Sequence, residues 1–82
     1  MTYTLDIQET ARRDMKAMSP EVARRIIKKL ELLRDDLQGD VKRLVNYSPA
    51  YRLRVGDWRV LFDVDGPTLK IQRVIHRSKA YD

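Results

Sequence analysis

Alternating apolar residues between positions 51 and 75 constrain the fold more than any other feature of this sequence. Every second residue is apolar from Tyr51 to Val55, and the alternation resumes from Trp58 to Val64 after the turn-forming pair Gly56-Asp57. A second turn signal, Asp65-Gly66-Pro67, precedes a third stretch from Thr68 to about Ile75. Period-2 patterns separated by short turn signals are typical of strands joined by tight turns. The sequence therefore predicts a three-stranded antiparallel meander.

The first 40 residues carry a strand pattern followed by two helical patterns. Tyr3, Leu5 and Ile7 alternate with polar residues, whereas Ala11, Met15 and Met18 have helical spacing. Ser19-Pro20 is a helix start, because serine caps free amides and proline suits the first helical position. The second helix is expected to run to about Asp36 with Gly39 as its stop, and its apolar stripe comprises Val22, Ile26, Ile27, Leu30, Leu33 and Leu37.

These elements predict one α+β domain over residues 1–82. The expected order is an N-terminal strand, a helical hairpin, a short strand or extended segment at 41–45, and then the antiparallel β-meander. An antiparallel sheet with the helices packed on one face accommodates this order.

Three arginines fall on one side of the predicted meander. Tyr51, Leu53 and Val55 belong under the helices, so alternation directs Arg52, Arg54 and Arg59 to the opposite, open face. Clustered like charges weaken a sheet, and the nearby acids are only Asp57 and Asp63. An anionic ligand would offset the repulsion, and the cluster therefore indicates phosphate binding.

The net charge is consistent with a polyanionic partner. The chain of 82 residues has a formal net charge of +5, and residues 1–40 hold eight basic and eight acidic side chains, so the whole excess lies in residues 41–82. A basic excess confined to half of a small domain favours a polyanion partner over a mere solubility surplus, because phosphates reward clustered cations through counterion release. Cysteine is absent, which excludes disulfides, thiol catalysis and thiolate metal sites and suggests a reducing cytoplasm. No apolar run could span a membrane, and we expect neither a metal nor a cofactor.

The C-terminal stretch adds groups suited to metal-free phosphate chemistry. "IHRSKAY" places the only histidine, His76, close to Arg77, Lys79 and Tyr81 at the end of the third strand. In RNA, the 2′-hydroxyl can attack its own phosphodiester when a protein orients the attack and stabilises the developing charge. Arginines suit the second task, a histidine can act as acid or base near neutral pH, and a tyrosine can stack on a base.

The stretch "YRLRVGDWRVLFDVDG", followed by "LKIQRVIHRSKAY", resembles the RelE/ParE superfamily of bacterial and archaeal toxins, and its RelE branch in particular. The resemblance extends over nearly the whole chain. It implies the RelE-like microbial RNase-type toxin fold and a metal-independent endoribonuclease that cuts mRNA in the ribosomal A site. It also implies a cognate antitoxin that holds the toxin inactive in a hetero-oligomer.

The resemblance assigns roles to individual residues. Arg52 and Arg54 match basic residues that bind phosphate and help to activate the 2′-hydroxyl, and Arg59 matches an arginine that stabilises the transition state. Arg77 matches an arginine linked to leaving-group protonation, and Tyr81 matches a tyrosine that stacks on a base. Further contacts to RNA are expected from Arg43, Lys70 and Lys79.

One departure from the RelE pattern leaves the acid and base open. The pattern has lysines at the positions of Arg52 and Arg54, and arginine is effectively never deprotonated. Activation then depends on charge and positioning, or on His76. Two other functions also stay open. A ParE-like chain would inhibit DNA gyrase without catalysis, and a decayed toxin would bind RNA without cleaving it.

Overall fold

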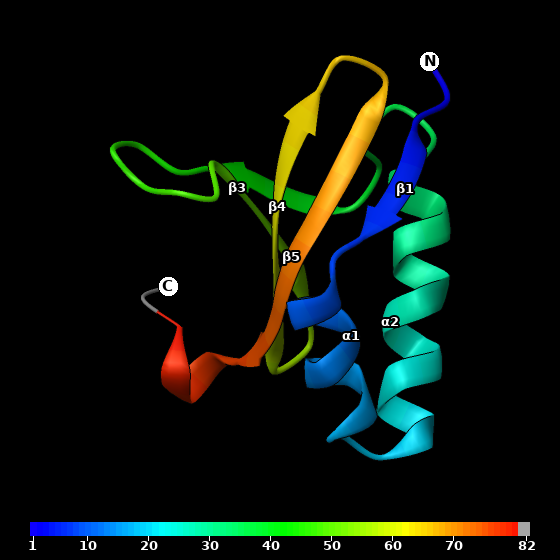
Figure 1. The fold of residues 1–82 in the computed structure, drawn as a ribbon, viewed down its shortest axis with the longest axis vertical. Coiled ribbons are helices and arrows are strands. Elements are labelled where there is room, and N and C mark those ends of the chain that lie inside the picture. The colour runs from blue at the N-terminus through cyan, green and yellow to red at the C-terminus, as the bar shows by residue number, and fades with distance from the viewer. Residues whose placement is uncertain (81–82) are drawn as a thin grey trace.

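A computed structural model describes residues 1–80 of the chain. Two α-helices and five strands are found within them (Figure 1), together with a terminal 3-10 helix. In chain order the elements are β1 (Thr4–Ile7), α1 (Glu9–Lys16), α2 (Pro20–Leu33), β2 (Asp40–Arg43), β3 (Tyr51–Val55), β4 (Trp58–Asp65), β5 (Thr68–His76) and η1 (Arg77–Lys79). The predicted order of strand, helical hairpin and meander is confirmed, and the segment at 41–45 contributes the short strand β2.

The strands form a single sheet in the order β1-β5-β4-β3-β2. β2 to β5 pair antiparallel with one another, as the turn signals predict. β1 instead pairs parallel with β5, with Leu5 opposite Leu69 and Ile7 opposite Ile71, so the sheet is mixed and the prediction of an antiparallel sheet was wrong at this edge. Alternation identifies a strand but carries no information about its partner or its direction, and the path through the helices decided both.

The second helix begins where the sequence predicts and ends earlier. The Ser19 Oγ accepts a hydrogen bond from the Val22 amide at 3.4 Å, and Pro20 is the first helical residue. The helix ends at Leu33 rather than near Asp36, because Asp36 and Leu37 both adopt positive φ angles of 56° and 58°. The stripe is also narrower than expected, since Ile27 is 39% exposed.

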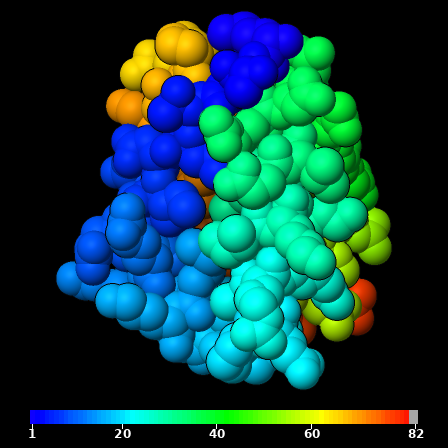
Figure 2. All heavy atoms as spheres, turned by 90° about the vertical axis from the view of Figure 1, so that its right-hand side faces the viewer, coloured from blue at the N-terminus to red at the C-terminus, as the bar shows by residue number. Residues whose placement is uncertain are grey.

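The core lies between the helices and one side of the sheet. Seen from the side of the helices (Figure 2), the N-terminal half of the chain hides most of the sheet. The fully buried side chains from this layer include Ile26, Leu30 and Leu33 of α2, which pack against Leu53, Val60 and Phe62 of the meander. Among residues 1–80, no helix combines the length and the apolar character needed to cross a bilayer. The other side of the sheet is not covered by the helices.

Candidate functional site

The side of the sheet away from the helices carries two cross-strand rows of charged residues. In the first row, Asp40 on β2 lies opposite Arg54, which in turn lies opposite Arg59 on β4. In the second row, Lys42 lies opposite Arg52, and Leu61 separates Arg52 from Arg73 on β5. We call the side defined by Arg52, Arg54 and Arg59 the arginine face. The register confirms that these three arginines share a face.

Two of the three arginines are buried, and the prediction that all three lie on an open surface was wrong. Arg59 is only 4% exposed, and its Nη1 donates to the carbonyl oxygens of Gly56 at 2.8 Å and Trp58 at 2.9 Å. Arg52 is 7% exposed, and its Nη1 donates to the Asp40 carbonyl at 3.2 Å. Alternation assigns a side chain to a face, but a long guanidinium can fold back on the backbone and satisfy its donors there.

Arg54 is the exposed member of the set, and Arg77 joins it at the end of the sheet. The turn between β3 and β4 lies beside η1, because the Arg77 amide donates to the Asp57 carbonyl at 2.7 Å. The Arg77 guanidinium lies 3.7 Å from the Asp57 carboxylate, and both side chains are exposed. Asp57 thus pairs with an arginine in addition to forming the turn. Arg54, Arg59 and Arg77 gather around one end of the β3–β4 hairpin.

His76 does not lie with the arginines. It pairs with Trp58 in the register, so it points to the other side of the sheet from Arg59. Its ring packs edge-on against Trp58 with centroids 5.4 Å apart. The Ser78 amide donates to His76 Nδ1 at 3.2 Å, and the Ser78 Oγ lies 2.9 Å from the same nitrogen. Trp58 is half-buried at the margin of the core.

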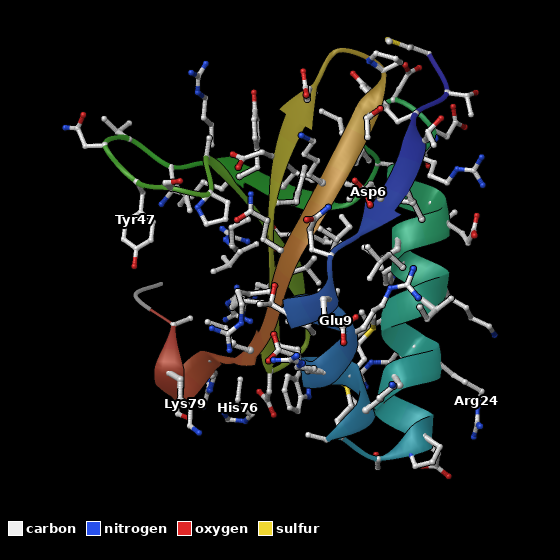
Figure 3. The ribbon with its side chains drawn as sticks, viewed as in Figure 1. Asp6, Glu9, Arg24, Tyr47, His76 and Lys79 are labelled. Carbon is white, nitrogen blue, oxygen red and sulfur yellow. The ribbon has the colours of Figure 1, made fainter. Side chains whose placement is uncertain are left out.

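The three additional basic residues are spread over the molecule. Arg43 lies over the ring of Tyr51, 5.9 Å from its centroid, on the helix side in the register. Lys70 lies near the opposite end of the hairpin and pairs with Asp65 at 3.3 Å. Lys79 lies on η1, close to His76 at the lower end of the view in Figure 3. Tyr81 falls outside the described residues, and its expected stacking role stays a prediction.

Sequence reasoning missed two residues that shape this region. Asp40 lies 3.5 Å from Arg52 and supplies an acid from the neighbouring strand, which only the pairing of β2 with β3 reveals. Arg73 forms a bidentate pair with Asp14 of α1, at 2.8 and 3.1 Å. The hydrogen bond and charge of Asp14 raise the pKa of Arg73. Residues 59 positions apart form this contact, and local spacing contains no signal for it.

The arginine face can bind and stabilise negative charge with groups that the fold already holds in place. Within the two rows, Asp40 is the one acidic residue beside five basic ones, of which Arg73 is already paired with Asp14 of α1. Residues 1–80 contain no group of three histidine, cysteine or acidic side chains placed to hold a metal ion. The arginine face offers guanidinium groups, which can bind the oxygens of an anion such as phosphate.

Comparison with known proteins places this fold and this charge pattern in a family. The model of the family described as the ParE toxin of the type II toxin–antitoxin system parDE matches residues 5–81. The chain belongs to the ParE toxin family. Through it, the chain is a member of the RelE/ParE superfamily of toxins, as the resemblance in the sequence indicated.

Several relatives of this ParE-family toxin carry RelE names. Toxin RelE3 of Methanocaldococcus jannaschii is 42% identical over 48 residues, which make up 58% of this chain and 54% of that toxin. The match thus spans about half the length of the curated relative. The toxin–antitoxin complex RelBE2 of Mycobacterium tuberculosis contains a chain with a TM-score of 0.81 and 28% identity, covering 94% of this chain and 100% of that one.

A second solved toxin–antitoxin complex contains a chain with a similar fold. The RelB–RelE antitoxin–toxin complex of Methanococcus jannaschii matches with a TM-score of 0.75 and 30% identity over 93% of this chain and 94% of that chain. A structure of the ParDE system of P. aeruginosa shares the fold at 17% identity and a TM-score of 0.68. The predicted fold class is confirmed by these structures together with the observed architecture.

Proposed function

We propose that this toxin is a metal-independent endoribonuclease that cleaves mRNA, in the A site of the ribosome, through attack of a 2′-hydroxyl on the adjacent phosphodiester. The observation that carries the proposal is the pair of directly opposed arginines, Arg54 and Arg59, beside Arg52 on a side of the sheet that the helices leave uncovered. Opposed like charges weaken a hairpin, and an anionic ligand on this side of the sheet would offset their repulsion. The carbonyl oxygens of Gly56 and Trp58 already hold Arg59, so the exposed Arg54 is the member of the pair best placed to meet such a ligand.

The two buried arginines suit transition-state stabilisation. Attack of the 2′-hydroxyl places extra negative charge on the phosphoryl oxygens, and donors that are already positioned stabilise it without reorganising. Two carbonyl oxygens hold the Arg59 guanidinium, and the Asp40 carbonyl and carboxylate hold that of Arg52. In this proposal the exposed Arg54 captures the substrate phosphate, and Arg77 at the end of the hairpin assists the leaving group.

The proton transfers are proposed to depend on charge and positioning rather than on His76. The histidine lies on the other side of the sheet, and its Nδ1 is occupied by the Ser78 amide. Arginine does not act as a base at neutral pH. We therefore expect a pH–rate profile without an inflection near the ordinary histidine pKa of about 6.5. A clear inflection there would return His76 to the role of acid or base.

A cognate antitoxin is proposed as the partner that silences the toxin in a hetero-oligomeric complex. The solved relatives from Mycobacterium tuberculosis and Methanococcus jannaschii are complexes of a toxin with its antitoxin. The net charge of +5 favours an acidic antitoxin segment, and mRNA and the ribosome place the activity in the cytoplasm.

The test is cleavage of a translated mRNA in a purified translation system, with cuts mapped by primer extension and with ribosomes present or omitted. Arg54→Ala and Arg77→Ala are expected to lower the cleavage rate by about 10²-fold or more, because each removes a charge partner of the reacting phosphate. Arg24→Ala on the outer side of α2, away from the arginine face (Figure 3), is the matched control. Equal rates for all three variants would contradict the proposal.

Inhibition of DNA gyrase is the second candidate, because the family model that matches is that of the ParE toxins. If the folded protein arrests growth but cuts no mRNA, a supercoiling assay with purified gyrase decides between the two functions. Loss of supercoiling at stoichiometric toxin would identify a gyrase inhibitor.

A further inference from the structure

A pocket of about 280 Å³ opens at the β5 edge of the sheet, beside the end of α1. We call it the η1 pocket, and its walls come from the last turn of α1, the end of β5 and η1. Its lining comprises Arg13, Asp14, Ala17, Met18, Trp58, Arg73, Val74, Ile75, His76 and Lys79. The volume lies just below the usual range of small-molecule sites, about 300–1,000 Å³. It suits a single nucleotide rather than a longer ligand.

The pocket combines an apolar wall with a positive rim. Met18, Ala17 and the half-buried Trp58 form a surface on which a flat ring can pack. The one carboxylate in the lining, Asp14, is already engaged by the Arg73 guanidinium and by the Val74 amide at 2.8 Å. The exposed cations Arg13 and Lys79 therefore set the charge that an incoming ligand meets, although Arg13 also lies 3.5 Å from Glu9.

The η1 pocket is continuous with the arginine face around the end of the sheet. Trp58 and Arg59 are neighbours that point to opposite sides of β4, and η1 carries Arg77 toward Asp57 and Lys79 toward the pocket. Arg77 and Lys79 lie two residues apart on the 3-10 helix η1, whose rise is about 2 Å per residue. A strand whose phosphate is held at Arg77 therefore has its neighbouring nucleotide within reach of the long Lys79 side chain.

We infer that the η1 pocket binds one nucleotide of the RNA, next to the phosphate held on the arginine face. The base packs against Trp58 and Met18, and its phosphate pairs with Lys79 and Arg13. The inference rests on the proposed function for its choice of RNA as the ligand. It adds a subsite at the β5 edge of the sheet, beside α1 and η1, that selects which nucleotide flanks the cleaved bond.

Trp58 is the only tryptophan of the chain, so its fluorescence reports directly on the pocket. The full chain is titrated with AMP, and with adenosine and inorganic phosphate separately. We expect saturable quenching by AMP, affinity at least about ten-fold weaker for adenosine, and no quenching by phosphate, because both the ring and the charge contribute. No saturable response to AMP, or equal responses to AMP and phosphate, would overturn the inference.

Two variants and a control locate the binding. Lys79→Ala removes an exposed charge and is expected to weaken AMP binding by about ten-fold. Ala17→Leu fills the pocket from the end of α1 and is expected to abolish the response, with circular dichroism confirming the fold. Arg24→Ala removes an equal charge from α2 and is expected to bind AMP as the wild type does. Wild-type affinity in both pocket variants would place the binding elsewhere.

The test of the η1 pocket can succeed or fail independently of the test of the nuclease proposal. AMP binding that depends on Lys79 in a protein that cuts no RNA would support the pocket and remove the proposed function. Ribosome-dependent cleavage without AMP binding would do the reverse. If both hold, Lys79→Ala should raise the KM for RNA and leave kcat within about three-fold, because the subsite contributes binding at a distance from the reacting phosphate.

Discussion

The arginines of the sheet differ in how far they support the fold. Arg59 is buried and donates to two carbonyl oxygens at the β3–β4 turn, whereas its cross-strand neighbour Arg54 is exposed. Hydrogen bonds from a charged group contribute about 1.5–3 kcal/mol when they are buried. If substitution of Arg59 lowers activity, the cause can be a lost contact with the ligand or a destabilised fold. At the exposed Arg54, only the lost contact applies.

Arg54→Ala and Arg59→Ala are expected to differ in stability while both lose activity. Arg59→Ala should lower the free energy of unfolding by about 1–3 kcal/mol, because it removes the donors to Gly56 and Trp58. Arg54→Ala should change it by less than about 0.5 kcal/mol, as expected for an exposed side chain. Urea denaturation followed by circular dichroism measures both. A destabilised Arg54→Ala would show that the exposed guanidinium is structurally engaged.

Position 39 favours glycine for two reasons, a positive φ angle and the close approach of a buried side chain, and a comparison with Gly66 separates them. Gly39 has φ +132°, and a Cβ there would lie 2.8 Å from the Cδ1 of the buried Leu53. Gly66 has φ +57°, and a Cβ there would meet no atom within 4 Å. We expect Gly66→Ala to cost about 1 kcal/mol of stability and Gly39→Ala about 2–3 kcal/mol, measured by urea denaturation. Equal losses would mean that Leu53 moves aside without cost.

At the scale of elements, α1 completes the edge of β5 where β1 stops. The parallel pairing of β1 ends at Ile71, and beyond it the edge is taken up by the helix. Thr10 Oγ1 donates to the Gln72 carbonyl at 2.5 Å, and Asp14 accepts from the Val74 amide at 2.8 Å. An edge strand left with open donors and acceptors is a site for unwanted pairing. The helix therefore protects the sheet as well as covering the core.

Asp14→Ala should lower stability by about 1–3 kcal/mol, because the Val74 amide and Arg73 lose their acceptor. Glu9→Ala is the matched control, since Glu9 forms an exposed pair with Arg13 on the same helix and should contribute less than about 0.5 kcal/mol. Thermal denaturation compares the two variants. Equal effects would show that the helix's contact with β5 does not depend on Asp14.

The pH dependence of the Asp14–Arg73 contact follows from the raised pKa of Arg73. A group whose pKa is raised in the folded state stabilises the fold below its unfolded pKa and loses that contribution as the pH rises through the folded value. For arginine this window lies in strong alkali. The Arg73 charge should therefore contribute equally at pH 6 and pH 9, and a stability difference that Asp14→Ala removes between these pH values would contradict the assignment.

At the scale of the whole molecule, the two halves of the chain divide the work. The N-terminal half is charge-balanced and supplies the helices, whereas residues 41–82 carry the entire excess of +5 and form most of the sheet. The helices cover one side of the sheet (Figure 1), and in the register Lys42, Arg52, Arg54 and Arg59 point to the other side. Such a field attracts and orients a polyanion before any specific contact forms.

Binding of single-stranded RNA with a 2′-deoxy linkage at each cleavage site should weaken steeply with salt. Each neutralised phosphate contributes a slope of about −0.7 in the logarithm of affinity against the logarithm of salt concentration. Arg54→Ala should lower the magnitude of the slope by about 0.7, and Arg24→Ala should leave it unchanged, as measured by fluorescence anisotropy. The same reduction in both variants would indicate diffuse attraction without a defined arginine face.

The prediction from sequence succeeded where one local pattern decides the outcome. Alternation from Tyr51 to Val64 predicted which residues of the hairpin share a face, and Ser19-Pro20 predicted where α2 begins. The same reasoning could not predict that Arg59 bends back to Gly56, because side-chain length allows both an exposed and a buried position. His76 is close in sequence to Arg77, yet the pleat directs the histidine to the other side of the sheet.

The sequence by itself determined where the strands and helices lie, that three arginines share one face of the sheet, and that the C-terminal half of the chain carries the net positive charge. These depend on periodicity and composition, which act over a few residues. Only the tertiary structure decided that β1 pairs parallel with β5, that Asp40 lies beside Arg52, and that Asp14 binds Arg73. Each of these depends on which distant segments become neighbours, and that is settled by packing the whole chain around one core.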